Sequence, residues 1–297
     1  MMTRITERML VNSFLDSLRS RLTHLQDAQD RVSTGKRLRQ PRDDPAGMER
    51  ALSLHSHLAQ TTERLQTLGL SREWLGASET ALGQLADVLS RARALAQSAT
   101  NVSLSATERT SLADQAQTLL EDTLSIANSK YGDRFLFAGF QTTTQPFTLD
   151  EGPPTAVVYH GDGGLIRHEI ETGTQIAVNV PGNHPLFTLG FDALINLRDM
   201  LLADDVAGIR STLDDLDEAM EQAVAARSSL GARVQRLTSA ESRLRQLQTD
   251  LQSALSRIED ADMAEAISNL MQQEQAYQAT LASGARIIQP TLLDYLR

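Results

Sequence analysis

The distribution of proline constrains the fold of this 297-residue sequence more than any other feature. None of the eight prolines lies between residues 46 and 145, and none lies between residues 186 and 289. A proline inside a helix removes a backbone hydrogen bond and costs roughly 3 kcal/mol. Two proline-free stretches of 100 and 104 residues are therefore expected to form long helices.

Leucine-type residues repeat at heptad spacing within both stretches. In the second stretch one recurs at every seventh position: Leu230, Leu237, Leu244, Leu251 and Ile258. In the first stretch the same spacing joins Leu75, Leu82 and Leu89. Such repeats are typical of coiled-coil seams. We also expect a helix from about residue 107 to 128, and another that starts near Phe191 with a break near Gly208.

The middle of the chain differs in composition from the flanking regions. Residues 131–191 hold eight of the twelve aromatic residues and five of the prolines. Short β-type runs occur at 134–138, 156–160, 166–171 and 175–180, separated by glycine and proline. The predicted fold class is mainly α with a small β-rich insert. Both halves of the chain contribute to a long antiparallel helical or coiled-coil bundle.

These patterns divide the sequence into five expected segments. Residues 1–43 and 256–297 are terminal amphipathic helices that together form one assembly domain. Residues 44–130 and 191–255 are the outgoing and returning helical arms. Residues 131–190 form the β-rich insert between the arms.

The two ends of the chain carry apolar stripes and opposite charge. The N-terminal stripe consists of Leu15, Leu18, Leu22, Leu25 and Val32, and the C-terminal stripe of Ile267, Met271, Leu281, Ile288, Leu292 and Leu296. Residues 1–42 hold nine Lys/Arg against four Asp/Glu, whereas residues 255–297 hold three against six. Such helices are suited to pair with each other or with neighbouring copies.

Gly284 and Pro290 interrupt the second stripe, and both stripes are narrow. We therefore expect the terminal helices to be weakly ordered in the monomer and to fold when neighbouring copies supply apolar surface. Head-to-tail contacts of this kind generate tubes or helical filaments.

Composition excludes several classes of function. The sequence contains no cysteine, so it has no disulfide, thiolate zinc site or cysteine nucleophile. Its net charge of −10 argues against a general nucleic-acid binder. No transmembrane or signal segment is apparent, which predicts no membrane insertion and either retention in the cytoplasm or export without a cleaved signal.

No catalytic, cofactor-binding or metal-binding constellation can be assembled from the sequence. His55 and His57 are two positions apart, so on a helix they point to different faces and chelate poorly. Asp260, Asp262 and Glu265 lack the glycine of a calcium loop and fall in a helical pattern. The protein is therefore expected not to be an enzyme.

The most informative stretch runs from residue 33 to 47. Gly35, within Ser33-Thr34-Gly35-Lys36-Arg37, permits a positive φ after the first helix. Within Asp43-Asp44-Pro45-Ala46-Gly47, Asp44 is an expected N-cap with Pro45 at the first helical position. On its own this stretch indicates a connector between two helices. It lacks the strand, the first glycine and the Ser/Thr of a phosphate loop.

The motifs Ser33–Arg37 and Asp43–Gly47 together resemble the N-terminal signature of the bacterial flagellin family. Two later segments resemble further signatures of that family: the segment from Arg227 to Arg233, which includes Gly231, and the segment from Asp260 to Glu265, which includes Asp262. The three matches occur in the family's order and in both halves of the chain.

Other residues resemble the members of this family that join hook to filament, rather than filament flagellins. They are Phe137-Ala138-Gly139, Tyr159-His160-Gly161-Asp162 and the ending from Gln289 to Leu296. The resemblance implies a non-enzymatic structural subunit in a tubular layer of the flagellum, with terminal helices inside and the β insert outside. It also implies extracellular location after type III export. The implied partners are further copies, hook-associated protein 1, flagellin and a cytoplasmic export chaperone.

Two alternatives stay open from the sequence alone. A filament flagellin would share the terminal signatures, and gene exchange would separate it from a junction subunit. A coiled-coil signalling protein would share the heptads, but it would require a membrane segment or an output domain.

Overall fold

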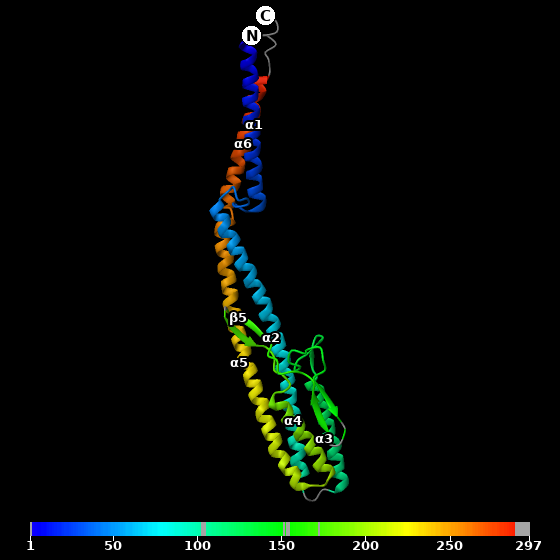
Figure 1. Ribbon diagram of the computed structural model, residues 1–297. Coiled ribbons are helices and arrows are strands. Elements are labelled where there is room, and N and C mark those ends of the chain that lie inside the picture. The colour runs from blue at the N-terminus through cyan, green and yellow to red at the C-terminus, as the bar shows by residue number, and fades with distance from the viewer. Residues whose placement is uncertain (1, 102–104, 151, 153–154, 172, 289–297) are drawn as a thin grey trace. The chain divides into compact units, whose positions relative to one another are not determined.

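The computed structural model describes residues 2–101, 105–150, 152, 155–171 and 173–288. Its helices are α1 (Met2–Thr34), α2 (Pro45–Ala99), α3 (Ala106–Ala127), α4 (Pro185–Leu202), α5 (Val206–Glu259) and α6 (Met263–Ile288) (Figure 1). Six short strands lie between α3 and α4. The expected fold class, mainly α with a small β-rich insert, is confirmed.

The chain divides into two compact units. Unit 1 comprises residues 1–60 and 247–297, and unit 2 comprises residues 61–246. The long helices α2 and α5, of 55 and 54 residues, each contribute to both units. Their lengths follow from the absence of proline inside them.

The heptad leucines of the arms form the core of unit 2. From α2 they include Leu75, Leu82 and Leu89, and from α5 Leu230 and Leu237, all almost fully buried. Alanines fill the neighbouring positions, among them Ala92, Ala96, Ala219 and Ala223. Leucine packed against alanine allows long helices to lie close together with few aromatic residues.

In its described residues the insert has three separate antiparallel strand pairs rather than one sheet. The pairs join β1 (Lys130–Tyr131) to β2 (Arg134–Phe135), β3 (Phe147–Asp150) to β4 (Ala156–Tyr159), and β5 (Arg167–Glu171) to β6 (Thr174–Ala177). β1 and β3 were not expected, and the expected strand at 134–138 ends at Phe135. It ends there because the next side chains, Leu136 and Phe137, turn into the core.

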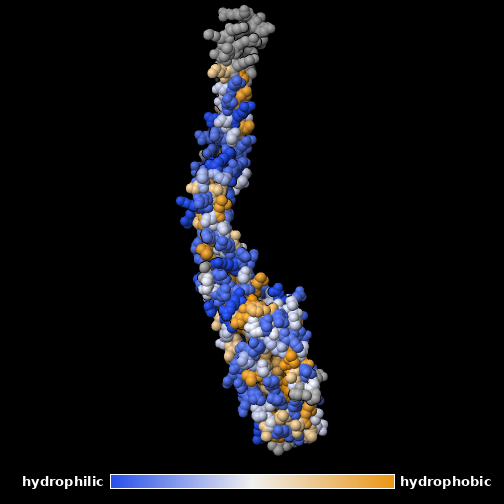
Figure 2. All heavy atoms as spheres, in the orientation of Figure 1, coloured by the Kyte–Doolittle hydropathy of each residue, from blue (hydrophilic) through white to orange (hydrophobic). Residues whose placement is uncertain are grey.

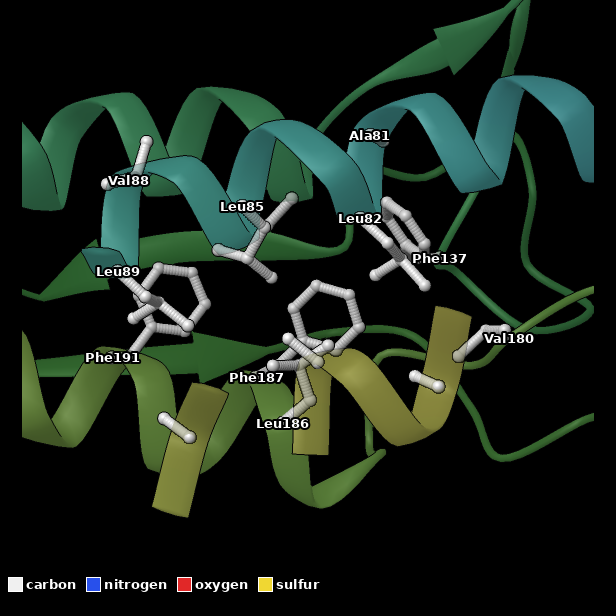
Figure 3. Packing of buried hydrophobic residues seen from close by; sticks show 14 of the residues in the cluster. Ala81, Leu82, Leu85, Val88, Leu89, Phe137, Val180, Leu186, Phe187 and Phe191 are labelled. Carbon is white, nitrogen blue, oxygen red and sulfur yellow. The ribbon is translucent and has the colours of Figure 1, made fainter. Parts of the chain in front are cut away.

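Aromatic side chains join the insert to the helices of unit 2. Phe137 lies against Phe187 of α4, with ring centroids 4.9 Å apart, and Phe147 packs on Phe187 and Phe191. Figure 3 shows Phe187 and Phe191 facing Leu85 and Leu89 of α2. The insert therefore shares the core of the arms.

The fourth helix begins earlier than expected, and its expected break lies a few residues before Gly208. α4 begins at Pro185, because the ring nitrogen Nδ1 of His184 accepts a hydrogen bond from the Leu186 amide (3.3 Å) and Pro185 occupies the first position. The break falls at residues 203–205, where Asp204 has a φ of 55°. The next helix starts with Asp205 Oδ1 accepting from the Gly208 amide (3.0 Å), so Gly208 lies inside α5.

A buried arginine ties together the ends of three helices in unit 2. The guanidinium of Arg109, on α3, donates to the carbonyl of Ala99 at the end of α2 (2.8 Å) and to that of Asn101 (3.4 Å). Its Nε pairs with the carboxylate of Asp204 in the turn between α4 and α5. One charged side chain thus links the end of α2 and the start of α3 to the distant turn between α4 and α5.

Candidate functional site

The N-terminal and C-terminal signature segments meet in one corner of unit 1. The Arg37 amide donates to the carbonyl of Glu259 (2.6 Å), and the Ala261 amide donates to the carbonyl of Gly35 (2.8 Å). Lys36 and Asp260 form an antiparallel bridge between these hydrogen bonds. Gly35 has a φ of +65°, as expected for a glycine that reverses the chain after a helix. This paired backbone is called the corner below.

Hydroxyl side chains end α1 before the corner. Ser33 Oγ and Thr34 Oγ1 both donate to the carbonyl of Asp30, at 3.1 and 2.7 Å. Thr34 Oγ1 also accepts from the Lys36 amide (3.3 Å). The hydroxyl of Thr34 thus connects the last turn of α1 to the first amide of the corner.

The second part of the N-terminal signature starts α2. Asp44 Oδ1 accepts from the Gly47 amide (3.0 Å) and Pro45 is the first helical residue, so the expected N-cap is confirmed. A Cβ on Gly47 would lie closer than 3.0 Å to the Asp44 carboxylate, which explains the glycine.

Asp43 closes the loop itself, because its carboxylate accepts from the amides of Gln40 and Arg39 (3.0 and 3.2 Å). These two bonds lower the pKa of Asp43 below its usual range.

The C-terminal signature interrupts the helical pattern. α5 ends at Glu259 and α6 begins at Met263, so the expected helical pattern was wrong for residues 260–262 and is confirmed for residues 263–265. Asp262 caps α6, because its Oδ1 accepts from the Ala264 and Glu265 amides at 2.9 and 3.3 Å.

The remaining family motif lies in unit 2, so it is not part of the corner. Arg227, on α5, is 3.5 Å from the carboxylate of Glu79 on α2. Gly231 is exposed, and a Cβ placed there would meet no atom within 4 Å. No contact within the described chain explains a glycine at this position.

The terminal helices α1 and α6 pack along each other within unit 1 (Figure 1). Along each helix, buried or half-buried residues follow one another at intervals of three, four or seven positions. They are Val11, Phe14, Leu18, Leu25, Ala28 and Val32 on α1, and Ala266, Leu270, Gln273, Tyr277, Thr280 and Gly284 on α6. Because this spacing defines one face of a helix, these residues form the seam between the two helices.

The seam contains small and polar residues where a stable coiled coil would have leucine. Oε1 of Gln273 is buried without a hydrogen-bond partner. Beside it lies a cavity of about 210 Å³ lined by polar groups including Asp27, Arg31 and Asn269. Gly284 is buried because the ring of Phe14 packs on it, and a Cβ there would lie closer than 3.0 Å to that ring. From the sequence, Gly284 was interpreted only as an interruption of the stripe.

Of the eight expected stripe residues whose side chains the structure describes, five lie outside the seam. Leu15 and Leu22 on α1 and Ile267, Met271 and Leu281 on α6 are 40–58% exposed. We call these five residues the outward stripe; Figure 2 shows apolar side chains among polar ones along this part of unit 1. Leu18, Leu25 and Val32 lie in the seam. Leu292 and Leu296, and the side chain of Ile288, lie outside the described residues.

The motifs of the middle segment converge in unit 2. The hydroxyl of Tyr159 lies 2.9 Å from the carbonyl of Phe137 and 2.8 Å from that of Asp162, and it accepts from the Gly182 amide (3.1 Å). Burial raises the pKa of Tyr159. A side chain on Gly161 would collide with this hydroxyl. The motif residues therefore fasten β4 to the segment after β2.

One titratable cluster was missed by the sequence reasoning. The Glu259 carboxylate, in the corner, pairs with Lys36 and with Nε2 of His55 (2.6 Å). The helical spacing of His55 and His57 does not reveal a partner of His55 that lies 204 positions away in the sequence. Within the described ranges, no three His, Asp or Glu side chains gather as a metal would require, and no helix there could cross a membrane.

Comparison with known proteins supports a family assignment. The model of the bacterial flagellin N-terminal helical region matches residues 5–142, and that of the C-terminal helical region matches residues 213–296. Flagellar hook-associated protein 3 of Salmonella typhimurium is 24% identical, over 93% of this chain and 94% of its own length. Its counterpart in Escherichia coli is 26% identical, over 84% and 86%.

The fold also has a close match among solved structures. A putative flagellar hook-associated protein from Vibrio parahaemolyticus superposes with a TM-score of 0.67. The match covers 73% of this chain and all of that structure, at 17% identity. The two flagellin signatures that meet in the corner lie inside the two matched regions. The chain therefore belongs to the bacterial flagellin family and is a structural component of the flagellum.

Proposed function

We propose that this protein is the subunit that joins hook to filament and that it assembles into a tubular layer through α1 and α6. The observation that carries the proposal is the outward stripe. In a single copy these apolar residues are exposed, although they lie next to the seam between α1 and α6. Similarity to hook-associated protein 3 along nearly the whole chain favours the junction position over that of a filament flagellin.

The composition of the seam explains why neighbouring copies are needed. Gln273, Thr280 and Gly284 contribute little apolar burial between α1 and α6. Covering the outward stripe would remove five half-exposed apolar side chains from water, each worth about 1 kcal/mol. A contact of this kind between different faces of identical copies adds one copy after another, and it gives a closed ring or an open helical tube according to the rotation between copies.

The five-segment division gives each part a role in this layer. Residues 1–43 and 256–297 form the inner assembly domain, residues 44–130 and 191–255 form the arms, and residues 131–190 form the outer insert. The stripe residues, including Ile288, Leu292 and Leu296, make contacts between copies. The signature residues from Ser33 to Gly47, with Asp262, shape the corner that connects the assembly domain to the arms.

The proposed partners follow from this role. They are further copies of the chain, hook-associated protein 1 on the hook side and flagellin on the filament side. A cytoplasmic export chaperone would hold the C-terminal helix until the subunit leaves by the flagellar type III pathway. In this role the protein is extracellular and carries out no catalysis.

Charged substitutions in the outward stripe test the proposal. Ile267→Asp and Met271→Asp should prevent self-assembly, because each places a carboxylate where a neighbour's apolar surface would lie. Sedimentation of the full chain measures assembly, and circular dichroism checks that the fold is kept. Gln272→Asp, on the exposed polar face of α6, is the matched control. Normal assembly of both stripe variants would contradict the proposal.

A further inference from the structure

Glu259 occupies an unusual position at the corner of unit 1. It is the last residue of α5, and its side chain is buried although it carries a carboxylate. Its backbone carbonyl accepts from two consecutive amides, those of Arg37 (2.6 Å) and Leu38 (3.2 Å). A buried carboxylate is costly unless charged partners compensate for lost water, so its surroundings need an explanation.

Two side chains from different segments provide that compensation. Lys36, in the loop between α1 and α2, contacts Oε2. His55, on α2, lies 2.6 Å from Oε1 through its Nε2. Each carboxylate oxygen therefore has its own partner. The end of α5 is connected through one side chain to α2 and to the loop that follows α1.

The other charged groups of the corner are engaged elsewhere. The guanidinium of Arg37 donates to the carbonyl of Ile258 (2.9 Å). The carboxylate of Asp260 accepts from Ser256 Oγ (2.6 Å) in the last turn of α5. Of the acidic side chains described in the corner, Glu259 is the one that joins segments from both halves of the sequence.

We infer that Glu259 is a positioning residue for assembly. Its contacts with Lys36 and His55 fix the backbone pairing of the corner, from which α1 and α6 both extend. That pairing sets the relative register of the two terminal helices and hence how the outward stripe is presented to another copy. The inference rests on the proposed assembly function.

The pH response of the corner follows from the same contacts. Burial alone would raise the pKa of Glu259, but hydrogen bonds from Lys36 and His55 and their charge lower it below the ordinary 4.5. A carboxylate with a lowered folded-state pKa stabilises the fold above the unfolded value, and this contribution is lost as pH falls through the folded value. The backbone pairing of the corner should therefore be stable at neutral pH and less stable in acid.

The chain offers a specific chemical reporter for this corner. Lys36 and Lys130 are its only lysines. Lys130, in the insert of unit 2, has no part in the corner and serves as an internal reference. Glu259→Gln in the full-length protein should raise the rate at which an amine-reactive reagent modifies Lys36 several-fold relative to Lys130. Protection of the Arg37, Leu38 and Ala261 amides from hydrogen exchange should fall about tenfold or more.

Matched variants separate positioning from general destabilisation. Asp260→Asn should leave both readouts at wild-type values, because the hydrogen bond of that carboxylate goes to Ser256, four positions away in the same segment. Lys36→Met should reduce amide protection as Glu259→Gln does, and Lys36→Arg should largely restore it. Acid should reduce the protection in wild type and change it little in Glu259→Gln. If Glu259→Gln fails to fold, Lys36→Met and Lys36→Arg still decide the question.

Assembly is then measured on the same samples by sedimentation. Slower assembly of Glu259→Gln, together with reduced protection of the corner amides from hydrogen exchange, supports the inference. A protected corner in Glu259→Gln, or a loosened corner with wild-type assembly, would overturn it. If stripe variants such as Ile267→Asp assemble normally, the proposed function fails instead, and this result is independent of the corner readouts.

Discussion

Replacing Gly284 with alanine should destabilise α6, whereas the same change usually stabilises a helix. Alanine is favoured over glycine in a helix interior by about 1 kcal/mol. At Gly284, however, the new methyl group would lie closer than 3.0 Å to the ring of Phe14. Forcing extra volume into a packed site costs about 1–3 kcal/mol. The net effect on α6 is therefore a loss of up to about 2 kcal/mol.

Hydrogen exchange of the amides in α6 measures this change locally. Gly69→Ala in α2 is the matched control, because a Cβ there meets no atom within 4 Å. It should increase protection of its own helix by the full propensity gain of about 1 kcal/mol. In a Phe14→Ala background the ring is absent, so Gly284→Ala should also increase protection. The resulting coupling energy between the two positions should be about 1–3 kcal/mol.

The opposite result would refute the packing between α1 and α6 described above. If Gly284→Ala increases protection of α6 as much as Gly69→Ala increases that of α2, the Phe14 ring does not lie on Gly284. Equal effects of Gly284→Ala with and without Phe14 would lead to the same conclusion.

Three further predictions concern the arms, the insert and the termini. Arg109→Met should lower the free energy of unfolding by about 2–3 kcal/mol in urea, because it leaves the Ala99 carbonyl unpaired, whereas Arg243→Met at an exposed pair should have little effect. Tyr159→Phe should cost about 1–2 kcal/mol in the same assay, since the hydroxyl binds three segments of the insert. Protease added to the monomer should trim roughly the first and last 40 residues and spare the rest, and equal resistance along the chain would contradict weak ordering of the termini.

Local signals in the sequence predicted the long elements well. Proline placement and heptad leucines were sufficient for α2 and α5, because helix interiors depend on nearby residues and on one repeating face. The start of α2 was predicted for the same reason, since Asp44 caps an amide three residues away. The start of α4 was missed, because a histidine cap at His184 followed by Pro185 is a weaker signal than serine or aspartate.

The site was harder to predict because its contacts join distant segments. The pairing of Glu259 with Lys36 and His55 spans more than 200 positions. The seam was also misjudged: the expected stripe ran through Ile267 and Met271, but α6 turns an adjacent row that includes Leu270 and Gly284 toward α1. Side-chain size alone does not reveal which of two adjacent stripes faces the chain's own partner helix.

Gene rescue tests the central proposal most directly. The gene is expressed in a bacterium that lacks its own hook–filament junction protein, and filaments attached to hooks are counted by electron microscopy. The proposal predicts that wild type restores attached filaments and that Ile267→Asp does not, although its circular dichroism is unchanged. Failure of wild type to restore attachment, together with rescue of a strain that lacks flagellin, would contradict the junction role and indicate a filament subunit.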